Sequence, residues 1–258
     1  MRTAATFDLT GRTALVTGAS SGLGARFAKI LSASGARVVL AARRTERLES
    51  LKTEIVDSGG HAMCVAMDVS DETSTISAYN AVEAKFGTID TIIANAGISH
   101  EGLAVEQSSA AFAGVFATNV LGVFLTLREG ARRMIASGSR ERGTGRIVII
   151  SSITAKIVTP RLVAYSASKA AVVHMGRIMA REWVRAGINV NTVLPGYIRT
   201  ELNADWFDSD GGKRQIAGFP RRRLMSDNQL DAMILYLCSD ASAEVTGGEF
   251  ILDDGQTL

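Results

Sequence analysis

A tyrosine and a lysine four residues apart form the first constellation that could carry chemistry. Tyr165 and Lys169 lie in AYSASKAAVVHMGRIM, an uninterrupted helical pattern, so both side chains lie on one helical face. Bringing the pKa of a free tyrosine from about 10 to near 7 requires roughly 4 kcal/mol of preferential phenolate stabilisation. A neighbouring ammonium supplies much of it, so the pair indicates a general acid/base tyrosine. The same spacing also occurs on plain helix surfaces, but the apolar run after the pair and the serine before it favour the catalytic interpretation.

A serine lies upstream of this pair. Ser152 follows the apolar run RIVIIS and precedes Tyr165 by thirteen residues. Ligands of parallel sheets gather beyond the carboxyl ends of strands, where the hydroxyl of Ser152 would polarise a substrate carbonyl. Ser151 is the competing choice on chemistry alone. Neither serine has a His/Asp pair at nucleophile-elbow spacing, which argues against acyl-enzyme chemistry.

A glycine-rich segment suggests a phosphate site. In TGASSGLGARFAKIL, Gly18, Gly22 and Gly24 stand where a strand-like run turns into a helical pattern. Glycine lets the backbone approach a pyrophosphate closely, and a helix N-terminus offers free N–H donors. The spacing is GxxxGxG rather than GxGxxG, and the Lys-Ser/Thr of a P-loop is missing. A purely structural tight turn is the alternative interpretation.

The elements that must position these residues alternate along the chain. Short β-branched runs separated by helical patterns indicate βαβ units and a parallel sheet with helices on both faces. The runs are almost continuously apolar, as expected for strands covered on both sides. The sequence therefore predicts an α/β fold with a doubly wound, seven-stranded sheet. The seven runs are TALVTG from 13, RVVLA from 37, HAMCVAM from 61, TIDTIIANAG from 88, GRIVIISS from 145, INVNTVLPG from 188 and EFILDDG from 249.

The composition narrows the function classes. The 258 residues are 47% hydrophobic and 21% charged with a formal net charge of +2, which excludes a disordered or collagen-like chain. A chain of this size buries about 70% of its surface unaided, so we expect one domain over residues 1–258. The dispersed basic clusters argue against a nucleic-acid partner. Cys64 and Cys238 lack CxxC spacing, so we expect no disulfide framework, no metal site and a cytoplasmic location.

One uncharged stretch is long enough to cross a bilayer. Residues 107–127 carry no charge over 21 positions. Gln107, Thr118 and Asn119 would need hydrogen-bond partners in lipid, so we interpret the stretch as a helix buried on several sides. The N-terminal residues lack the apolar run of a signal peptide, and we expect no membrane partner.

Five motifs in order resemble the short-chain dehydrogenase/reductase family. They are TGASSGLG from 17, NAG from 95, Ser152, YSASK from 165 and PGYIRT from 195. The resemblance covers essentially the whole chain. It implies a single Rossmann-type domain and reversible hydride transfer between NAD(H) or NADP(H) and a ketone or secondary alcohol. Ala94 stands where the family often has a first Asn, and DDGQ replaces the commoner DGG, but neither departure removes a reacting group.

The same resemblance implies roles for individual residues. The family's thirteen-residue offset selects Ser152 over Ser151, and Asn119 matches a catalytic asparagine that supports the lysine through a backbone group and a water. On the residues alone, Asn119 would be a polar residue in helix packing. The implied catalytic set is Asn119, Ser152, Tyr165 and Lys169. The implied cofactor-binding set is Gly18, Ser20, Ser21, Gly22, Leu23, Gly24, Arg43, Asp68, Val69, Asn95, Ala96, Gly97, Tyr165, Lys169, Pro195, Gly196, Ile198 and Thr200.

The end of the second strand-like run predicts the cofactor. An acidic residue there would hydrogen-bond a ribose 2′-hydroxyl, but Ala42 occupies the place. Arg43 and Arg44 follow and form a pair able to bind a 2′-phosphate. We therefore expect NADP(H) as the cofactor, with NAD(H) as the alternative. The structural alternative is that the two arginines are only solvated residues at the start of a helix. Asp68 is either an adenine contact or the N-cap of the next helix.

The segment at about 197–220 is predicted to be a substrate lid. Trp206 and Phe207 precede Gly211 and Gly212, which we interpret as an aromatic segment next to a flexible hinge. The expected substrate contacts are His100, Leu202, Trp206 and Phe207. A 3-oxoacyl-thioester (acyl carrier protein) reductase and an NAD-dependent sugar or alcohol dehydrogenase are alternatives, and a non-catalytic nucleotide sensor is a third. The apolar helices around Asn119 and Tyr165 predict a homo-oligomer, and the family resemblance implies a dimer or a tetramer.

Overall fold

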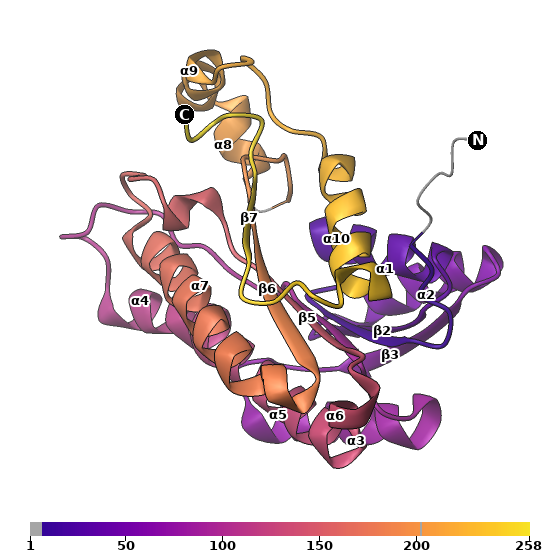
Figure 1. The fold of residues 1–258 in the computed structure, drawn as a ribbon. Coiled ribbons are helices and arrows are strands. Elements are labelled where there is room, and N and C mark those ends of the chain that lie inside the picture. Colours follow the sequence, from indigo (N-terminus) through magenta and orange to yellow (C-terminus); the bar gives the residue numbers. More distant parts are fainter. Residues whose placement is uncertain (1–6, 202) are drawn as a thin grey trace.

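Seven parallel strands form the central sheet of the molecule (Figure 1). The computed structural model describes residues 7–201 and 203–258. The strand order is β3-β2-β1-β4-β5-β6-β7, so the predicted doubly wound α/β fold is confirmed. Each strand falls on one of the seven predicted runs. Their bounds are β1 Thr13–Thr17, β2 Arg37–Ala42, β3 His61–Ala66, β4 Thr91–Ala94, β5 Gly145–Ile150, β6 Ile188–Pro195 and β7 Glu249–Leu252.

Helices cover both faces of this sheet. Along β1, Val16 packs in the hydrophobic cluster beneath α1, α2 and α10, whereas Leu15 packs in the cluster beneath α3, α5 and α7. Alternate residues of one strand therefore pack into the two hydrophobic cores on opposite faces of the sheet. This is why the strand sequences are apolar without interruption. The helices are α1 Gly22–Ala33, α2 Thr45–Asp57, α3 Glu72–Phe86, α4 Ser109–Phe116, α5 Gly122–Ala136, α6 Ser139–Arg142, α7 Val163–Trp183, α8 Ala204–Asp208, α9 Asp210–Gly218 and α10 Asp231–Cys238.

The uncharged stretch at 107–127 is built into the sheet-covering layer. It forms α4, a π-helical turn at Ala117–Leu121 and the start of α5. Helix Ser109–Ala136 contains an 18-residue window that is apolar enough to cross a membrane by length and composition, and 39% of this window is buried inside the protein. Val115, Val123 and Leu127 are buried against the rest of the protein, whereas Phe112 and Leu121 are exposed, so within this protomer one side of the helix is covered.

The predicted lid at about 197–220 contains α8 and α9, which project beyond the carboxyl edge of the sheet (Figure 1). The expected glycine hinge is wrong. Gly211 and Gly212 lie in the first turn of α9, which the Ser209 side chain caps through the Gly212 N–H. A Cβ on Gly212 would lie 2.1 Å from the carbonyl oxygen of Trp206. The glycine therefore allows α9 to pack closely on α8.

Candidate functional site

A cavity of about 640 Å³ opens at the carboxyl edge of the sheet. It lies where β1 and β4 adjoin and the chain order reverses, the usual ligand position of doubly wound folds. Gly24, Asn119 and His100 lie outside its lining, and Leu202 lies outside the described residues. The other predicted site residues all line the cavity, namely Gly18, Ser20, Ser21, Gly22, Leu23, Arg43, Asp68, Val69, Asn95, Ala96, Gly97, Ser152, Tyr165, Lys169, Pro195, Gly196, Ile198, Thr200, Trp206 and Phe207.

The glycine loop has the shape of a phosphate cradle. Gly18 and Gly22 adopt φ angles of 68° and 52°, in the left-handed region that favours glycine. A Cβ on Gly24 would lie 2.3 Å from the Gly18 carbonyl oxygen, so Gly24 lets α1 pack against the loop. Helix α1 begins without a side-chain cap and without an acidic residue in its first turn. Its free N–H groups suit a pyrophosphate.

Thr17 holds the loop after β4 in place. Its Oγ1 accepts hydrogen bonds from the backbone N–H groups of Asn95 and Ala96, at 3.0 and 3.1 Å. The Asn95 side chain donates to the Thr17 carbonyl oxygen at 3.0 Å. The sequence analysis did not identify Thr17. The polar residue that closes the first apolar run, next to the glycine loop, was the signal available.

The end of β2 carries two arginines in different situations. Arg44 donates to the Ser20 and Ser21 hydroxyls at 2.9 and 3.3 Å and so bridges back to the glycine loop. Arg43 is exposed and lines the cavity with Asp68. A hydrogen bond from Ser70 lowers the pKa of Asp68, and the charge of Arg43 contributes in the same direction.

Asp68 is not a helix cap. It accepts from the N–H and hydroxyl of Ser70, whereas Asp71 caps α3 by accepting from the Ser74 N–H. The N-cap alternative for Asp68 is therefore wrong, because the helix begins three residues later than that alternative requires.

Tyr165 and Lys169 lie on the first two turns of α7, as the sequence predicted. The Lys169 Nζ lies 5.6 Å from the centre of the Tyr165 ring and donates to the Ile150 carbonyl oxygen at 2.9 Å. Burial lowers the pKa of Lys169 to about 8. Burial also raises the pKa of Tyr165 to about 12, against the opposing effect of the Ser152 hydroxyl. The protein by itself therefore keeps the phenol protonated, and lowering its pKa requires additional positive charge.

The two candidate serines differ in the hydrogen bonds of their hydroxyl groups. The Ser151 hydroxyl is buried and donates to the Lys169 carbonyl oxygen at 2.9 Å. The Ser152 oxygen accepts from the Thr154 N–H and hydroxyl at 3.2 and 3.1 Å, which leaves its own proton for a ligand. This difference favours Ser152 for polarising a carbonyl.

Asn119 lies behind the cavity wall on the π-helical turn. Its Oδ1 accepts from the Ile98 N–H, and its Nδ2 donates to the Ile98 carbonyl, both at 2.9 Å. Nδ2 also donates to the Ser168 hydroxyl at 3.0 Å. Asn119 thus ties the loop after β4 to α7, the helix that carries Lys169.

The aromatic residues of the lid lie differently from one another. Phe207 is buried against Tyr197, with ring centroids 5.8 Å apart, whereas Trp206 is 39% exposed and donates from Nε1 to Gln215. His100 does not line the cavity, although its neighbours Ser99 and Glu101 do. The sequence analysis also missed other lining residues on this side, namely Thr154, Thr159, Arg161, Tyr197 and Gln215.

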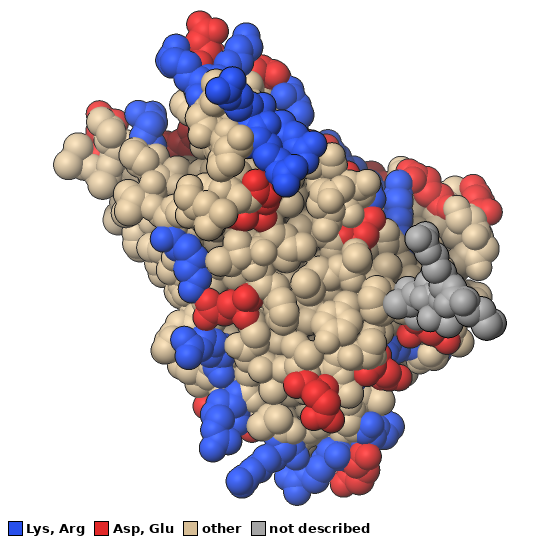
Figure 2. All heavy atoms as spheres, turned by 45° about the horizontal axis from the view of Figure 1, so that its top comes forward, with Lys and Arg blue, Asp and Glu red and all other residues tan. Residues whose placement is uncertain are grey.

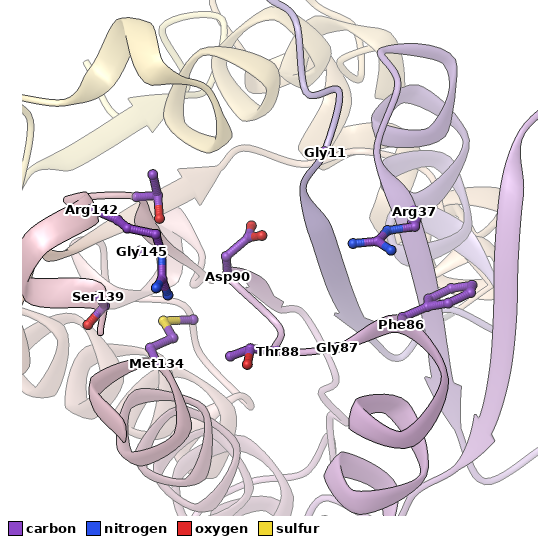
Figure 3. A pocket seen from close by; sticks show the side chains of 11 residues that line it. Gly11, Arg37, Phe86, Gly87, Thr88, Asp90, Met134, Ser139, Arg142 and Gly145 are labelled. Carbon is purple, nitrogen blue, oxygen red and sulfur yellow. The ribbon is translucent and has the colours of Figure 1, made fainter. Parts of the chain in front are cut away.

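A smaller cavity of about 240 Å³ lies near the amino ends of the strands (Figure 3). Its charged groups have partners within the protein. Arg37 donates to Thr13, Arg142 to Ser137, and Asp90 accepts from Arg12 and Thr91. Within residues 7–201 and 203–258, no group of three or more His, Cys, Asp or Glu side chains is arranged to hold a metal ion.

Comparison with known proteins agrees with this geometry. Residues 12–211 match the family model described as short chain dehydrogenase. A D-threitol dehydrogenase of Mycolicibacterium smegmatis is 34% identical over 98% of this chain and 95% of its own, and a gluconate 5-dehydrogenase of Gluconobacter oxydans is 35% identical over 98% and 97%. The crystal structure of a gluconate 5-dehydrogenase from Burkholderia cenocepacia in complex with NADP and tartrate superposes with a TM-score of 0.91, at 32% identity, over 98% of this chain and 97% of that one. The chain therefore belongs to the short-chain dehydrogenase family and is an NAD(P)-dependent oxidoreductase of alcohols and ketones.

Proposed function

We propose that this enzyme prefers NADP(H) and uses Tyr165 as the general acid/base in reversible oxidation of a secondary alcohol. One observation carries the proposal. Ser152, Tyr165 and Lys169 line the same cavity as the glycine loop and Arg43. When bound, the cofactor supplies or accepts the hydride at its nicotinamide ring.

The cavity lining supports the cofactor-binding residues that the family resemblance implies. The uncapped N-terminus of α1 and the glycine loop bind the pyrophosphate. Asp68 and Val69 contact the adenine, and Asn95, Ala96 and Gly97 line the path to the nicotinamide. Thr200 would contact the nicotinamide amide, and Pro195, Gly196 and Ile198, at and beyond the end of β6, line the cavity beside it.

Tyr165 moves the proton. In reduction its hydroxyl donates to the substrate carbonyl oxygen, and in oxidation its phenolate accepts from the alcohol. Moving the pKa of Tyr165 from about 12 to near 7 corresponds to roughly 7 kcal/mol. The Lys169 ammonium supplies part of this free energy, and the positive charge of an oxidised nicotinamide adds to it. Ser152 donates to the substrate oxygen, and Asn119 positions Lys169 through α7.

The preference for NADP(H) over NAD(H) rests on the end of β2. Ala42 leaves no carboxylate to repel a 2′-phosphate, and Arg43 is exposed in the cavity without an ion-pair partner among the described residues. Arg44 already bridges to Ser20 and Ser21, which places a second guanidinium beside the same region. NAD(H) is the alternative cofactor.

The proposed substrate is a polyhydroxylated secondary alcohol, with the segment at about 197–220 closing over it. The relatives named for threitol and gluconate support this class, as do the polar groups of Thr154, Thr159 and Gln215 in the cavity. An acyl-thioester substrate is not favoured by these comparisons, and the catalytic set argues against a non-catalytic sensor.

We further propose that the protein is a homo-oligomer, a dimer or a tetramer, in the cytoplasm. Phe112, Leu121 and Ile178 are 38%, 45% and 47% exposed on the outer helices α4 and α7 and the π-helical turn, where a second copy would cover them. Figure 2 also shows a broad area free of charged residues over β7 and α10, where Ile251 is 46% exposed. The free thiols of Cys64 and Cys238 suit a reducing compartment.

The experiment that tests the cofactor assignment compares kcat/KM for NADPH and NADH. Arg43→Ala should weaken NADPH by about tenfold to a hundredfold, because a charge-assisted contact of roughly 1.5–3 kcal/mol is lost, and should leave NADH nearly unchanged. Ala42→Asp should move the preference towards NADH. Lys52→Ala, which removes a cation of α2 outside the cavity, is the matched control. A wild type that prefers NADH would refute the assignment, as would an Arg43→Ala variant that loses both cofactors equally.

A further inference from the structure

Arg161 occupies the catalytic half of the cavity in an unusual backbone conformation. It belongs to the segment between β5 and α7 and lines the cavity together with Thr159 and Leu162. Its φ angle is 71°, and it follows Pro160 in a turn. A proline followed by a residue with positive φ is typical of a type II turn, in which the second position favours glycine or asparagine. An arginine there costs about 1 kcal/mol or more of backbone strain, which points to a role for its side chain.

The guanidinium of Arg161 is free to bind a ligand. The residue is exposed, and among residues 7–201 and 203–258 no carboxylate oxygen lies within 4.0 Å of it. The other cations of the cavity are placed differently. Lys169 donates to the Ile150 carbonyl and Arg44 to the glycine-loop serines. Arg43, after the end of β2, lines the cavity with Asp68, after the end of β3. Among the arginines that line the cavity, Arg161 is the nearest in sequence to Tyr165.

One neighbouring feature strengthens the positive potential at this position, and a second holds the turn in place. Helix α7 begins directly after Leu162, with no side-chain cap and no acidic residue in its first turn. The uncompensated N–H groups of a helix N-terminus favour an anion. The Arg161 carbonyl accepts from the Gly102 N–H at 3.0 Å, which joins this turn to the loop after β4, and both segments contribute lining residues to the cavity.

Glu101 is the acidic residue next to this junction. It also lines the cavity and is exposed, but it forms no ion pair with Arg161 within 4.0 Å in the described part of the chain. The guanidinium is therefore not neutralised by it, and a ligand carboxylate can take the two-pronged hydrogen bond that arginine offers.

We infer that Arg161 is a specificity-determining residue that binds a carboxylate of the substrate, so that the enzyme acts on hydroxy acids and their oxo acids in preference to neutral polyols. This inference rests on the proposed function, because it places the carboxylate in the cavity where Tyr165 and Ser152 meet the secondary alcohol. It adds no chemical step. The carboxylate binds at Arg161, and the alcohol carbon is the one that is oxidised.

The test uses matched pairs of probes that differ in one group. Gluconate and glucitol, and threonate and threitol, each exchange a carboxylate for a hydroxymethyl group. Calorimetric dissociation constants of the NADPH-loaded enzyme, which cannot oxidise an alcohol, are measured first, so that the result does not depend on turnover. KM and kcat with NADP⁺ are then measured for each compound that is oxidised. Arg161→Gln should weaken binding of the carboxylates by about tenfold to a hundredfold, as expected for loss of a charge-assisted pair. Binding of the neutral polyols should stay within about twofold, and kcat should change little.

Further variants separate recognition from folding. Arg161→Gly relaxes the turn and should keep or raise the unfolding temperature while it loses the carboxylate preference. Arg161→Lys should retain part of that preference. Arg181→Gln, on the exposed side of α7, should behave as wild type, and Glu101→Gln should bind the carboxylates at least as tightly as wild type.

The inference is overturned if wild type binds gluconate and threonate no more tightly than glucitol and threitol, or if Arg161→Gln weakens acids and polyols equally. A Glu101→Gln variant that loses carboxylate binding would overturn it as well. The proposed function fails in a different way. In that case the probes bind with the expected preference, but Tyr165→Phe oxidises them as fast as wild type does.

Discussion

Removal of the Asn119 side chain should destabilise the protein by an amount that the structure allows us to work out. Asn119→Ala breaks the paired hydrogen bonds to the N–H and carbonyl of Ile98 and the bond to Ser168. Each buried polar group left unpaired costs roughly 1–3 kcal/mol. Because Ile98 is only half-buried, the cost for its N–H and its carbonyl lies at the lower end of this range. We therefore expect the free energy of unfolding to fall by about 2–4 kcal/mol. This corresponds to a decrease of roughly 5–15 °C in unfolding temperature for a chain of this length.

The assay is denaturant unfolding of three variants followed by circular dichroism. Thr126→Val is the matched control, because Thr126 is buried on α5 and its hydroxyl makes one bond to the Gly122 carbonyl at 2.8 Å. It should cost about 1 kcal/mol or less. Asn119→Asp keeps the acceptor for the Ile98 N–H but turns a carboxylate oxygen towards the Ile98 carbonyl, so it should cost at least as much as Asn119→Ala.

The same variants report on the catalytic lysine. A Cβ placed on Gly97 would lie 3.4 Å from the Asn119 Oδ1 and 3.5 Å from the Lys169 Nζ, so the two groups share one neighbourhood. A carboxylate in Asn119→Asp should therefore raise the pKa of Lys169 and shift the pH profile of activity. If Asn119→Ala unfolds within about 1 kcal/mol of wild type and retains its pH profile, the assignment of Asn119 as a positioning residue is refuted.

Two further predictions concern Lys169 and the apolar helix surface. Because burial lowers the pKa of Lys169 from 10.5 to about 8, the folded protein releases a proton between these values that the unfolded chain keeps, so this contribution to stability is complete above pH 10.5 and is lost as pH falls through 8. In parallel denaturant titrations, the free energy of unfolding of wild type should rise between pH 7.5 and 9.5 by about 2 kcal/mol more than that of Lys169→Met. Equal pH dependence of the two proteins would contradict the assignment of Lys169 as a buried lysine. In light scattering at micromolar concentration, wild type should be an oligomer and Leu121→Lys should dissociate, whereas a monomeric wild type would disprove the proposed assembly.

Much of the fold could be predicted because parallel strands buried on both faces leave a simple pattern. Leu15 and Val16 face different cores, and neither position tolerates a polar side chain, so the first run is apolar without alternation. The helix that carries Tyr165 and Lys169 was equally plain, since nothing interrupts its sequence before Trp183. In both cases local composition and tertiary burial point to the same structure.

The errors arose where tertiary packing decides what a residue does. Gly211 and Gly212 indicated a hinge, but Gly212 gives α9 room to approach the Trp206 carbonyl. Asp68 and Asp71 are both capping residue types, and only the chain path determines that Asp71 caps α3. The π-helical turn around Asn119 depends on contacts to Ile98 and on α7 and has no local sequence signature.

Some partners in the site could not be inferred from spacing. Arg44 was expected only as one of two arginines near a phosphate, yet it reaches across the loop to Ser20 and Ser21. Thr17 holds Asn95 through a hydrogen bond between residues that are distant in sequence. Thr154 holds Ser152 through a hydrogen bond that forms within a single 3₁₀ turn. Arg161 carries no sequence signal of strain, because a positive φ is visible only in the folded chain.

The most direct test of the central claim is turnover by Tyr165→Phe under conditions where cofactor binding is measured separately. The substitution removes only the transferable proton, so NADPH affinity, followed by its fluorescence, should stay within about twofold of wild type, while kcat for ketone reduction falls by roughly 10²–10⁴. The result that would contradict the account is a variant that binds NADPH normally and still reduces the ketone within about tenfold of the wild-type rate.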